Sequence, residues 1–349
     1  MKWKISVKIQ SITTEVKYIP LKTPFITALR RVDNIEFVRV KVSCDNGLIA
    51  YGEAPATKAI TGEDIEIILN SISSVKELFI NQSPQEALDI LHKKTEIGSS
   101  AKAALDIALF SLLAQEKKMS LFEFLGAEKP ITLYTDITIS LKNTDEMLED
   151  SKSAFNAEMK ILKVKLGKDI NHAIEVIQTI SREIPEAEIL VDANQAWSLN
   201  DSMKFLNAVK DLKIELIEQP VVADDLDGLK SITNATKIPI LADESAFDLE
   251  DVKRVVESKS ADMINIKLMK CGGLTKAVEI LEYAREHNVV CMLGSMLEGP
   301  ISINAALHLA FAYHDVIKYI DLDSPLLYKR ASSELDFIFD GAKIVYNQY

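Results

Sequence analysis

The sequence predicts an α/β fold: a modified TIM barrel, (β/α)7β, with an α+β capping domain formed by the N-terminal region and the C-terminal tail. Between residues 163 and 267, five short runs of Ile, Leu and Val each close on charged residues and alternate with amphipathic segments. The charged residues recur at intervals of about 25 residues, which is the length of one strand and one helix. In a (β/α)8 barrel such strand ends meet at one rim and build the site.

The 349 residues divide into three predicted segments. Residues 1–125 form the capping domain and residues 126–325 form the barrel. Residues 326–349 are too short to fold alone, so we expect this C-terminal segment to pack back on the capping domain. The barrel segment alternates strictly between strand and helix patterns. Its first strand falls within residues 131–140, its eighth within residues 316–323, and seven helices lie between them.

The capping domain opens with antiparallel β structure and continues with helices. A strand is predicted over residues 5–12, and FVRVKVSCDNGLIAYGEA reads as a hairpin whose Asn46-Gly47 turn supplies positive φ values. Local capping patterns then mark the helices. These signals are the capping-box pairs Thr61/Asp64 and Ser83/Glu86, and Gly98 before a long Ala/Leu helix that ends near Lys117.

Composition narrows the class of protein. The chain is 48% hydrophobic and 26% charged, and its net charge of −12 disfavours nucleic acid or an anionic membrane as a partner. Three cysteines without a CxxC pair indicate neither a disulfide framework nor a zinc ribbon, so a reduced, cytoplasmic setting is predicted. The first ten residues do not resemble a signal peptide, and the most apolar stretch is too short to span a membrane. A homo-oligomer is compatible with these features.

Three carboxylates end three consecutive predicted strands. Asp192, Glu218 and Asp243 close the runs LVD, LIE and LAD. Surface acids are common in an acidic protein, but oxygen ligands in register on neighbouring strands suit a hard divalent cation such as Mg²⁺, one per subunit. Asn194 lies two residues after Asp192, which places it on the same strand face, and Glu244 follows Asp243. We expect both to support the metal ligands from outside.

Lysines complete the predicted site. Lys163 and Lys165 are two residues apart on the second strand, so they point the same way, and a buried strand has little structural reason to carry two cations inward. The alternative is that both point outward between the helices. Lys267 ends the sixth strand, across the barrel. A neighbouring cation lowers the pKa of a lysine, so Lys163 would make Lys165 a usable base. Two lysines on opposite sides of a bound substrate could remove an α-proton from one face and return it on the other.

In combination these motifs resemble those of a known family. KVK on the second strand, the Asp/Glu/Asp set on the next three strands and NIKLMKCGG on the sixth are similar to the muconate-lactonizing subgroup of the enolase superfamily, over the whole chain. In that superfamily a Lys or His base acts with one or two Mg²⁺ ions that stabilise an enediolate. The resemblance implies that Lys165 and Lys267 are the catalytic acid/base pair and that Lys163 helps to neutralise the enolate. It also implies three Mg²⁺ ligands, Asp192, Glu218 and Asp243.

Two further motifs narrow the substrate. Asp321 and Asp323 lie on one face at the end of the eighth strand, where they could accept a substrate ammonium group; an acidic loop start is the alternative. The pair resembles the feature by which dipeptide epimerases hold the free amino terminus. PFITALRRV at residues 24–32 is similar to the capping loop of alanyl-glutamate epimerases, which implies that Arg30 meets the substrate's side-chain carboxylate and that Arg31 is a solvated neighbour. The other specificity residues are expected at the seventh strand's end: Ser295, Met296, Leu297 and Glu298.

The predicted function is a Mg²⁺-dependent dipeptide epimerase, an isomerase acting on L-Ala-D/L-Glu or a related dipeptide by two-lysine 1,1-proton transfer through a metal-stabilised enediolate. The alternative on the same scaffold is an N-acylamino acid racemase or an o-succinylbenzoate synthase. A Schiff-base aldolase using Lys267 and a non-catalytic metal-binding barrel are the remaining rivals. The five histidines lie in helical patterns away from the strand ends, and Cys271 has no strand-end histidine beside it, so neither receives a catalytic role.

Overall fold

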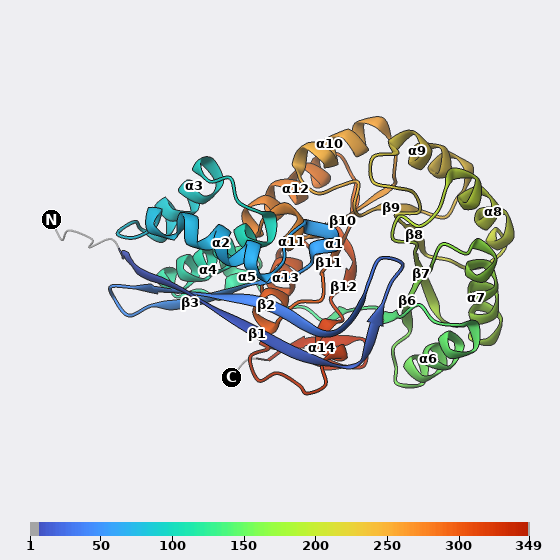
Figure 1. The fold of residues 1–349 in the computed structure, drawn as a ribbon, viewed down its shortest axis with the longest axis horizontal. Helices are drawn as coiled ribbons and strands as arrows, with labels where there is room; N and C mark the ends of the chain where they lie inside the picture. The colour runs from blue at the N-terminus through green and yellow to red at the C-terminus, as the bar shows by residue number, and fades with distance from the viewer. Residues whose placement is uncertain (1–6, 348–349) are drawn as a thin grey trace.

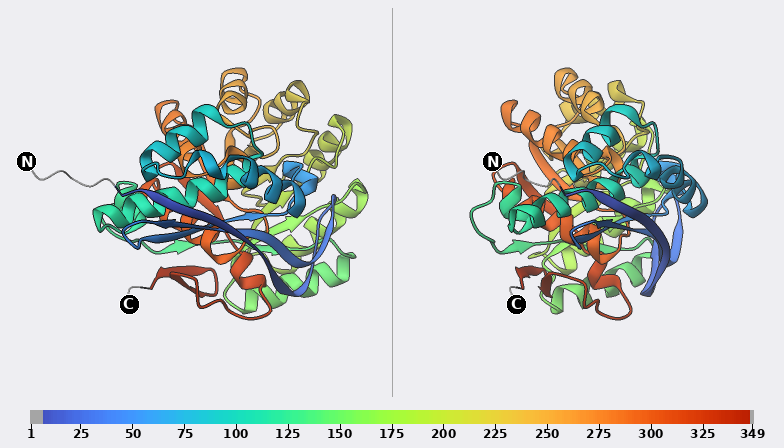
Figure 2. Two further views of the ribbon diagram at one scale, coloured as in Figure 1. Left: turned by 60° about the vertical axis from the view of Figure 1, so that its left-hand side comes forward. Right: turned by 90° about the vertical axis from the view of Figure 1, so that its left-hand side faces the viewer.

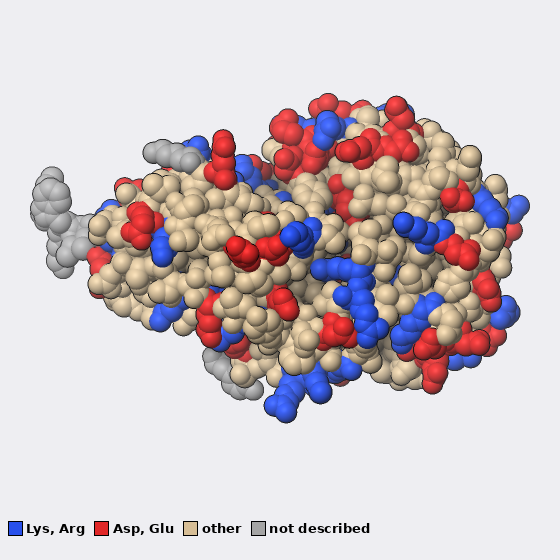
Figure 3. Space-filling view, in the orientation of Figure 1, with Lys and Arg blue, Asp and Glu red and all other residues tan. Residues whose placement is uncertain are grey.

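The computed structural model describes residues 7–347 of the chain. Figure 1 shows an antiparallel sheet with helices packed on it, joined to a ring of strands surrounded by helices. This confirms the predicted fold class, since eight parallel strands form one nearly closed barrel beside a three-stranded antiparallel sheet. Within the described residues, no helix is long and apolar enough to cross a membrane. Figure 3 shows basic side chains interspersed with acidic ones over one face of the molecule.

The capping domain is built on a long β-hairpin whose strands pair in antiparallel register. Its buried core joins valines of the second strand, Val38, Val40 and Val42, to apolar residues of the helices. The sheet therefore buries one face under the helices, and the hairpin tip reaches the barrel (Figure 1). The elements are β1 (Ile9–Ile26), β2 (Arg31–Cys44), β3 (Ile49–Pro55), α1 (Lys58–Thr61), α2 (Ile65–Val75), the 3₁₀ helix η1 (Lys76–Leu78), α3 (Pro84–Lys94), α4 (Ser99–Lys117) and α5 (Leu121–Phe124).

The barrel alternates strands with helices, as the sequence predicts. Its strands are β5 (Ile137–Ile139), β6 (Ile161–Lys165), β7 (Glu188–Asp192), β8 (Leu216–Glu218), β9 (Ile240–Ala242), β10 (Met263–Lys267), β11 (Val290–Gly294) and β12 (Ile317–Asp321). The helices are α6 (Thr144–Asn156), α7 (Ile170–Glu183), α8 (Leu199–Val209), α9 (Leu226–Ala235), α10 (Leu249–Ser258), a short α11 (Leu268–Cys271), α12 (Leu274–Glu286) and α13 (Pro300–Ala312). Thus seven full-length helices and one extra turn lie between the eight strands.

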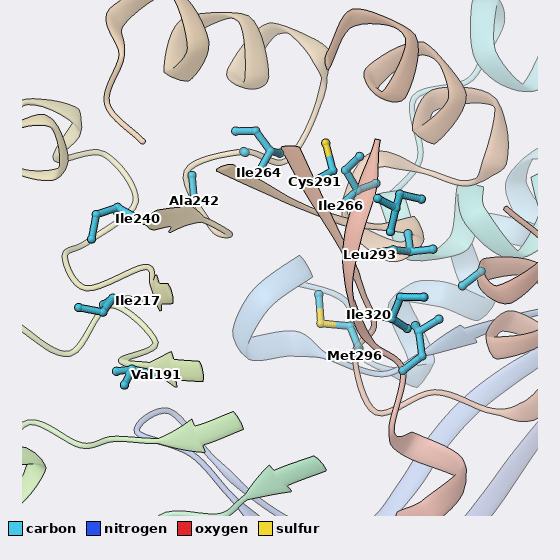
Figure 4. Packing of buried hydrophobic residues seen from close by; sticks show 14 of the residues in the cluster. Val191, Ile217, Ile240, Ala242, Ile264, Ile266, Cys291, Leu293, Met296 and Ile320 are labelled. Carbon is cyan, nitrogen blue, oxygen red and sulfur yellow. The ribbon is translucent and has the colours of Figure 1, made fainter. Parts of the chain in front are cut away.

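Successive strand residues face opposite sides of the barrel wall, because the side-chain period of a strand is two. Figure 4 shows Val191, Ile217 and Ile240 on the side of the strands toward the helices, where they join the main core cluster. The other face closes the bottom of the barrel with a separate apolar layer. This layer consists of Leu190, Leu216, Leu241, Met263 and Met292, with Ile161 and Tyr319 packed against it.

Most local predictions in the capping domain are confirmed, and three are wrong. The strand predicted over residues 5–12, of which 5 and 6 lie outside the described residues, begins at Ile9 and continues to Ile26 as β1. Ser83 and Glu86 form a capping box at the start of α3, and α4 begins after Gly98 and ends at Lys117. Thr61 does not cap a helix with Asp64, because Asp64 is itself the N-cap of α2 and accepts a hydrogen bond from Ile67 N.

In the turn after β2, only Gly47 adopts a positive φ; the Asn46 side chain instead accepts a hydrogen bond from Leu48 N. The predicted first barrel strand also divides. Its first half, β4 (Leu133–Tyr134), pairs with the C-terminal strand β14 (Lys343–Tyr346), and only β5 enters the barrel.

Helix α12 is capped by the other domain. Helices α6 to α10 each begin at their own Asn, Asp or Ser cap. Helix α12 begins at Gly273 instead, and Asp106 of α4 accepts hydrogen bonds from Leu274 N at 2.6 Å and Thr275 Oγ1 at 2.6 Å. A Cβ at position 273 would lie 2.4 Å from Asp106 Oδ1, so the glycine gives this carboxylate its room. The carboxylate also complements the positive end of the helix dipole.

Helix α13 is capped in the same way. It begins after Gly299, and Glu53 of β3 accepts a hydrogen bond from Ile301 N at 2.8 Å while Arg39 pairs with its other oxygen at 2.6 Å. A Cβ at position 299 would lie 2.4 Å from Glu53 Oε2. Two buried carboxylates of the capping domain therefore fix the two barrel helices that follow β10 and β11.

The C-terminal segment contacts both parts of the molecule. After α14 (Ser324–Leu327), Tyr328 forms a β-bridge with Leu21 of β1, and Glu334 pairs with Arg39. Strand β13 (Phe337–Asp340) then pairs with β14, which continues the small sheet to β4. Figure 2 shows this hairpin beside the capping sheet.

The barrel has a seam between β5 and β12. Among the described residues these two strands share no ladder of backbone hydrogen bonds. The seam is bridged instead by the loop before β5: Asp136 N donates to Ile320 O at 3.1 Å, and Thr135 Oγ1 accepts a hydrogen bond from Leu322 N at 3.0 Å. Thr138 N on β5 donates to the Asp323 carboxylate at 2.8 Å. A backbone hydrogen bond and hydrogen bonds to side chains therefore close this part of the wall.

Candidate active site

The charged residues at the strand ends lie on the same inward face of the barrel wall as the apolar layer. Asp192, Glu218 and Asp243 each follow a leucine of that layer by two residues, so they point into the barrel one level closer to its carboxyl-end rim. All three are buried. The strands β7, β8 and β9 are neighbours in the sheet, so the three carboxylates enter the barrel side by side. That they bind one metal ion together stays a prediction.

Each predicted metal ligand is in contact with a lysine. Lys165 Nζ donates to Asp192 Oδ2 at 2.5 Å, and Lys267 Nζ donates to Asp243 Oδ2 at 2.7 Å. Glu218 accepts a hydrogen bond from Asn265 Nδ2 at 2.8 Å. Burial, reinforced by the charge of Asp192, raises the pKa of Glu218 to about 7.

Lys163 lies beneath these groups and is fully buried. Its Nζ is 2.6 Å from Asp321 Oδ2, 2.6 Å from Glu218 Oε2 and 3.4 Å from Asp192 Oδ2. Burial disfavours the ammonium, but the surrounding carboxylates outweigh it and hold the pKa of Lys163 well above its usual range. Lys163 is thus inward-facing, as predicted, and its charge neutralises the carboxylates around it.

The two predicted bases face each other across the barrel. Lys165 ends β6 and Lys267 ends β10, and three strands separate β6 from β10 in either direction around the ring. Both side chains line the same cavity. Burial lowers the pKa of Lys267, but the Asp243 carboxylate outweighs burial, so the pKa lies above the usual value for lysine. Gly294 leaves room beside this lysine, since a Cβ there would lie 3.0 Å from Lys267 Cε.

The cavity lies between the barrel rim and the hairpin tip of the capping domain. Arg30 lines it from the turn between β1 and β2, whereas the neighbouring Arg31 is exposed and pairs with Asp33 at 3.0 Å. This is the difference between the two arginines that the sequence motif implies. The cavity is lined by Phe25, Thr27, Leu29, Arg30, Ile60, Thr138, Lys165, Asn194, Asp243, Glu244, Lys267, Ser295, Met296, Leu297, Asp321 and Asp323.

Three carboxylates meet across the barrel seam. Asp136, Asp321 and Asp323 each offer an oxygen within 4.8 Å of the others, so this group could hold a cation. Asp321 and Asp323 line the cavity, as predicted; Asp136 lies behind them, with neither oxygen hydrogen-bonded to a described residue. Burial and the charge of Asp321 raise the pKa of Asp323 to about 6 and that of Asp136 well above its ordinary value.

The two residues expected to support the metal ligands line the cavity as well. Asn194 reaches it for a different reason from the predicted one, because β7 ends at Asp192 and Asn194 lies in the following loop with a φ of 44°. Its backbone N–H donates to Asp192 Oδ1 at 2.9 Å. Burial and the nearby charges of Asp243 and Asp192 raise the pKa of Glu244 to about 8.

The predicted residues after β11 divide between the cavity and the interior. Ser295, Met296 and Leu297 line the cavity. Glu298 does not: it is buried, its Oε1 accepts a hydrogen bond from Met296 N at 2.9 Å, and burial raises its pKa to about 7. Glu298 therefore holds the shape of this loop from within.

The donor set fits a hard divalent cation. Asp192, Glu218 and Asp243 provide carboxylates from three adjacent strands, and Glu218 Oε2 is buried in an ion pair with Lys163 Nζ at 2.6 Å. Each of the three is balanced by a lysine, which is the arrangement expected of carboxylates that need a positive partner in a dry interior. Thr138, Asn265 and Lys270 also belong to the site. Sequence reasoning missed them; only the inward spacing of Asn265, two residues before Lys267, could have signalled one of them.

Comparison with known proteins agrees with this arrangement. Two protein-family models match the chain. The family "Enolase C-terminal domain-like" matches residues 146–344, and the family "Mandelate racemase / muconate lactonizing enzyme, N-terminal domain" matches residues 8–126. The chain is 61% identical over 337 residues to the L-amino acid-D/L-Glu epimerase of Sulfurimonas denitrificans, covering 97% of this chain and 99% of that protein. It is 39% identical to the L-Ala-D/L-Glu epimerase of Bacillus subtilis, covering 97% and 94%.

Solved structures show the same relationship. The substrate-liganded L-Ala-D/L-Glu epimerase of Bacillus subtilis superposes with a TM-score of 0.93 at 37% identity, covering 97% of this chain and 96% of that one. The dipeptide epimerase of Enterococcus faecalis, complexed with Mg and the dipeptide L-Leu-L-Tyr, superposes with a TM-score of 0.89 at 33% identity, covering 93% and 92%. The chain therefore belongs to the enolase superfamily, within its mandelate racemase/muconate lactonizing enzyme group.

Proposed function

We propose that the protein is a Mg²⁺-dependent dipeptide epimerase that inverts the α-carbon of the carboxyl-terminal residue of L-Ala-L-Glu or a closely related dipeptide. One observation carries this proposal: Lys165 and Lys267 line one cavity from opposite sides of the barrel. An α-carbon held between two amines can lose its proton to one and regain a proton from the other on the opposite face. The 61% identity to the L-amino acid-D/L-Glu epimerase of Sulfurimonas denitrificans supports this proposal.

The metal site in this proposal is formed by Asp192, Glu218 and Asp243. Mg²⁺ held there would draw charge from the substrate carboxylate and so increase the acidity of the α-proton. Lys165 and Lys267 now donate to Asp192 and Asp243. When these carboxylates serve as metal ligands, the two ammonium groups lose their partners and the attraction that raises the pKa of Lys267. Lys267 would then be unprotonated, and able to accept a proton, in a larger fraction of molecules near neutral pH.

The ends of the cavity set the orientation of the dipeptide. Asp321 and Asp323 would accept the substrate ammonium group through charge-assisted hydrogen bonds. Arg30, on the capping domain, would receive the side-chain carboxylate of the second residue. Thr138 lines the cavity beside Asp323 and donates its backbone N–H to that carboxylate. Binding both ends of the substrate would hold its α-carbon between the lysines.

The test is proton NMR of L,L-dipeptides in D₂O with Mg²⁺ and the protein. We expect loss of the α-proton signal of the second residue, with epimerisation, for Ala-Glu and its acidic relatives. In Lys267→Ala, epimerisation should stop while one face still exchanges through Lys165; full epimerisation would refute the two-base scheme. Exchange in N-acylated amino acids but in no dipeptide would assign the site to N-acylamino acid racemisation instead.

A further inference from the structure

Lys270 is a buried cation that the proposed reaction does not use. It lies in the single turn α11, directly after β10, and it is only 3% exposed. It does not line the cavity, in contrast to Lys267 one turn earlier. A buried ammonium group is costly unless its donors are satisfied. The contacts that satisfy Lys270 therefore indicate what it is for.

Four oxygens surround the Lys270 ammonium. Asp243 supplies two of them, Oδ1 at 2.6 Å and its backbone carbonyl at 2.6 Å. The backbone carbonyls of Asn265 and Ala246 lie at 2.8 Å and 3.1 Å. Three of the four acceptors thus belong to the four-residue segment that begins at Asp243, and the fourth belongs to β10. Lys270 ties the loop after β9 to the neighbouring strand.

These contacts divide the two oxygens of Asp243 between two lysines. Lys270 binds Oδ1, whereas Lys267 binds Oδ2 at 2.7 Å. A carboxylate held by one oxygen and by its own backbone carbonyl cannot rotate freely. Its second oxygen therefore points in a fixed direction, toward Lys267 and the cavity.

The Asn265 side chain does the same for a second predicted ligand. Its Nδ2 donates to Glu218 Oε1 at 2.8 Å, while the backbone carbonyl of Asn265 accepts a hydrogen bond from Lys270 Nζ. The other oxygen, Glu218 Oε2, lies 2.6 Å from Lys163 Nζ. Two ligand carboxylates on β8 and β9 are therefore aligned from the same short stretch of β10 and α11.

We propose that Lys270 is a positioning residue of the metal site: it holds Asp243 so that Oδ2 is presented to Mg²⁺, and it sets the spacing between Asp243 and Glu218. The inference rests on the proposed function for the identity of the metal ligands. Groups that orient metal ligands from outside typically contribute about 10–100-fold to metal affinity.

The experiment measures the binding of Mg²⁺ alone by isothermal titration calorimetry, without substrate. Lys270→Met keeps the length of the side chain and removes the ammonium. We expect its dissociation constant for Mg²⁺ to rise about 10–100-fold. The matched control is Lys276→Met: Lys276, on α12, pairs with Glu279 and lies outside the cavity. This control should bind Mg²⁺ like the wild type.

The direction of the change in Mg²⁺ affinity distinguishes a positioning role of Lys270 from a purely electrostatic one. Removing a positive charge beside a cation site strengthens cation binding if charge alone matters. Unchanged or tighter Mg²⁺ binding by Lys270→Met would therefore overturn the proposal, as would a variant that is less stable but binds Mg²⁺ with wild-type affinity. If Lys270→Met does not fold, Lys270→Gln retains two N–H donors without the charge and is expected to bind several-fold more weakly than the wild type; wild-type affinity would overturn the proposal.

The same titration, together with the NMR assay of turnover, distinguishes the two proposals. Mg²⁺ binding by the wild type without turnover of any dipeptide would overturn the proposed function and leave the role of Lys270 standing. No Mg²⁺ binding by the wild type would overturn both.

Discussion

Three glycine substitutions test how much room the carboxylates that cap α12 and α13 need. Two of the glycines lie against these carboxylates, and the third, Gly47, lies against neither and serves as the comparison. Gly273→Ala places a Cβ 2.4 Å from Asp106 Oδ1 at a φ of +113°, so both the backbone and the cap are disturbed. Gly299→Ala places a Cβ 2.4 Å from Glu53 Oε2, but its φ of −80° suits any residue. Gly47→Ala has a φ of +89° and no atom within 4 Å, so only the backbone is strained. The three variants separate the two costs.

The magnitudes follow from these contacts. A left-handed backbone costs an L-residue about 1–2 kcal/mol, which is the expected loss in Gly47→Ala. Displacing a capping carboxylate costs about 0.5–2 kcal/mol and overpacking about 1–3 kcal/mol, so Gly299→Ala should lose roughly 2–5 kcal/mol. Gly273→Ala carries both costs and should lose roughly 3–7 kcal/mol. The gain from a less flexible unfolded chain, about 0.4–1 kcal/mol, is common to all three and cancels in the comparison.

Urea denaturation followed by circular dichroism measures the free energy of unfolding of each variant against the wild type. The expected order of stability is wild type, Gly47→Ala, Gly299→Ala and then Gly273→Ala. If Gly299→Ala is as stable as Gly47→Ala, Glu53 does not need the space that this glycine leaves. If Gly273→Ala is no less stable than Gly299→Ala, the two costs do not add, and the reasoning fails.

Three further predictions concern the site. Burial and the charge of Asp321 raise the pKa of Asp323 to about 6, so the carboxylate pair that would bind the substrate ammonium is fully ionised only above that pH. KM for a dipeptide should therefore rise below pH 6, by up to about 10-fold per pH unit. A flat KM between pH 7 and 5 would contradict this. Arg30→Met should lose about 2 kcal/mol, or roughly 30-fold in kcat/KM for Ala-Glu, whereas Arg31→Met, which removes only the pair with Asp33, should not; equal losses in steady-state assays would reject the assignment. Chelation by EDTA should abolish α-proton exchange and lower the thermal unfolding midpoint relative to the Mg²⁺-loaded protein, since an ion that binds only the folded state stabilises it; exchange that persists in EDTA would count against the metal site.

The sequence predicts the barrel and its strand-end acids because the same βα unit recurs. Strand ends of a parallel barrel converge whatever the helices between them contain, so Asp192, Glu218 and Asp243 can be placed from spacing alone. The inward direction of Lys163 follows from the strand period in the same way. What spacing does not give is the partner of each charge, and the Asp321 contact of Lys163 depends on a strand more than 150 residues away.

The residues that were missed depend on loops. From the sequence, Lys270 would be expected to be a solvated lysine on a helix surface. It is buried because the loop after β9 folds over it. Asp136 sits inside a run that reads as one strand, but that run divides between two sheets, which turns its carboxylate toward Asp321. The capping roles of Asp106 and Glu53 are equally hidden, because the helices that they cap begin at Leu274 and Pro300, which lie 168 and 247 residues later in the chain.

The seam between β5 and β12 makes the integrity of the barrel wall sensitive to what occupies its rim. Asp136 belongs to one edge of the seam and Asp321 to the other, and burial together with the charge of Asp321 raises the pKa of Asp136, so an ionised pair across the seam is unfavourable without a cation. A cation accepted by both edges would act as a cross-link between the first and last strands. Binding of a cation there would then slow amide hydrogen exchange at Thr138, whose N–H donates to the Asp323 carboxylate. Hydrogen exchange at the seam would therefore detect a bound ligand even when no reaction takes place.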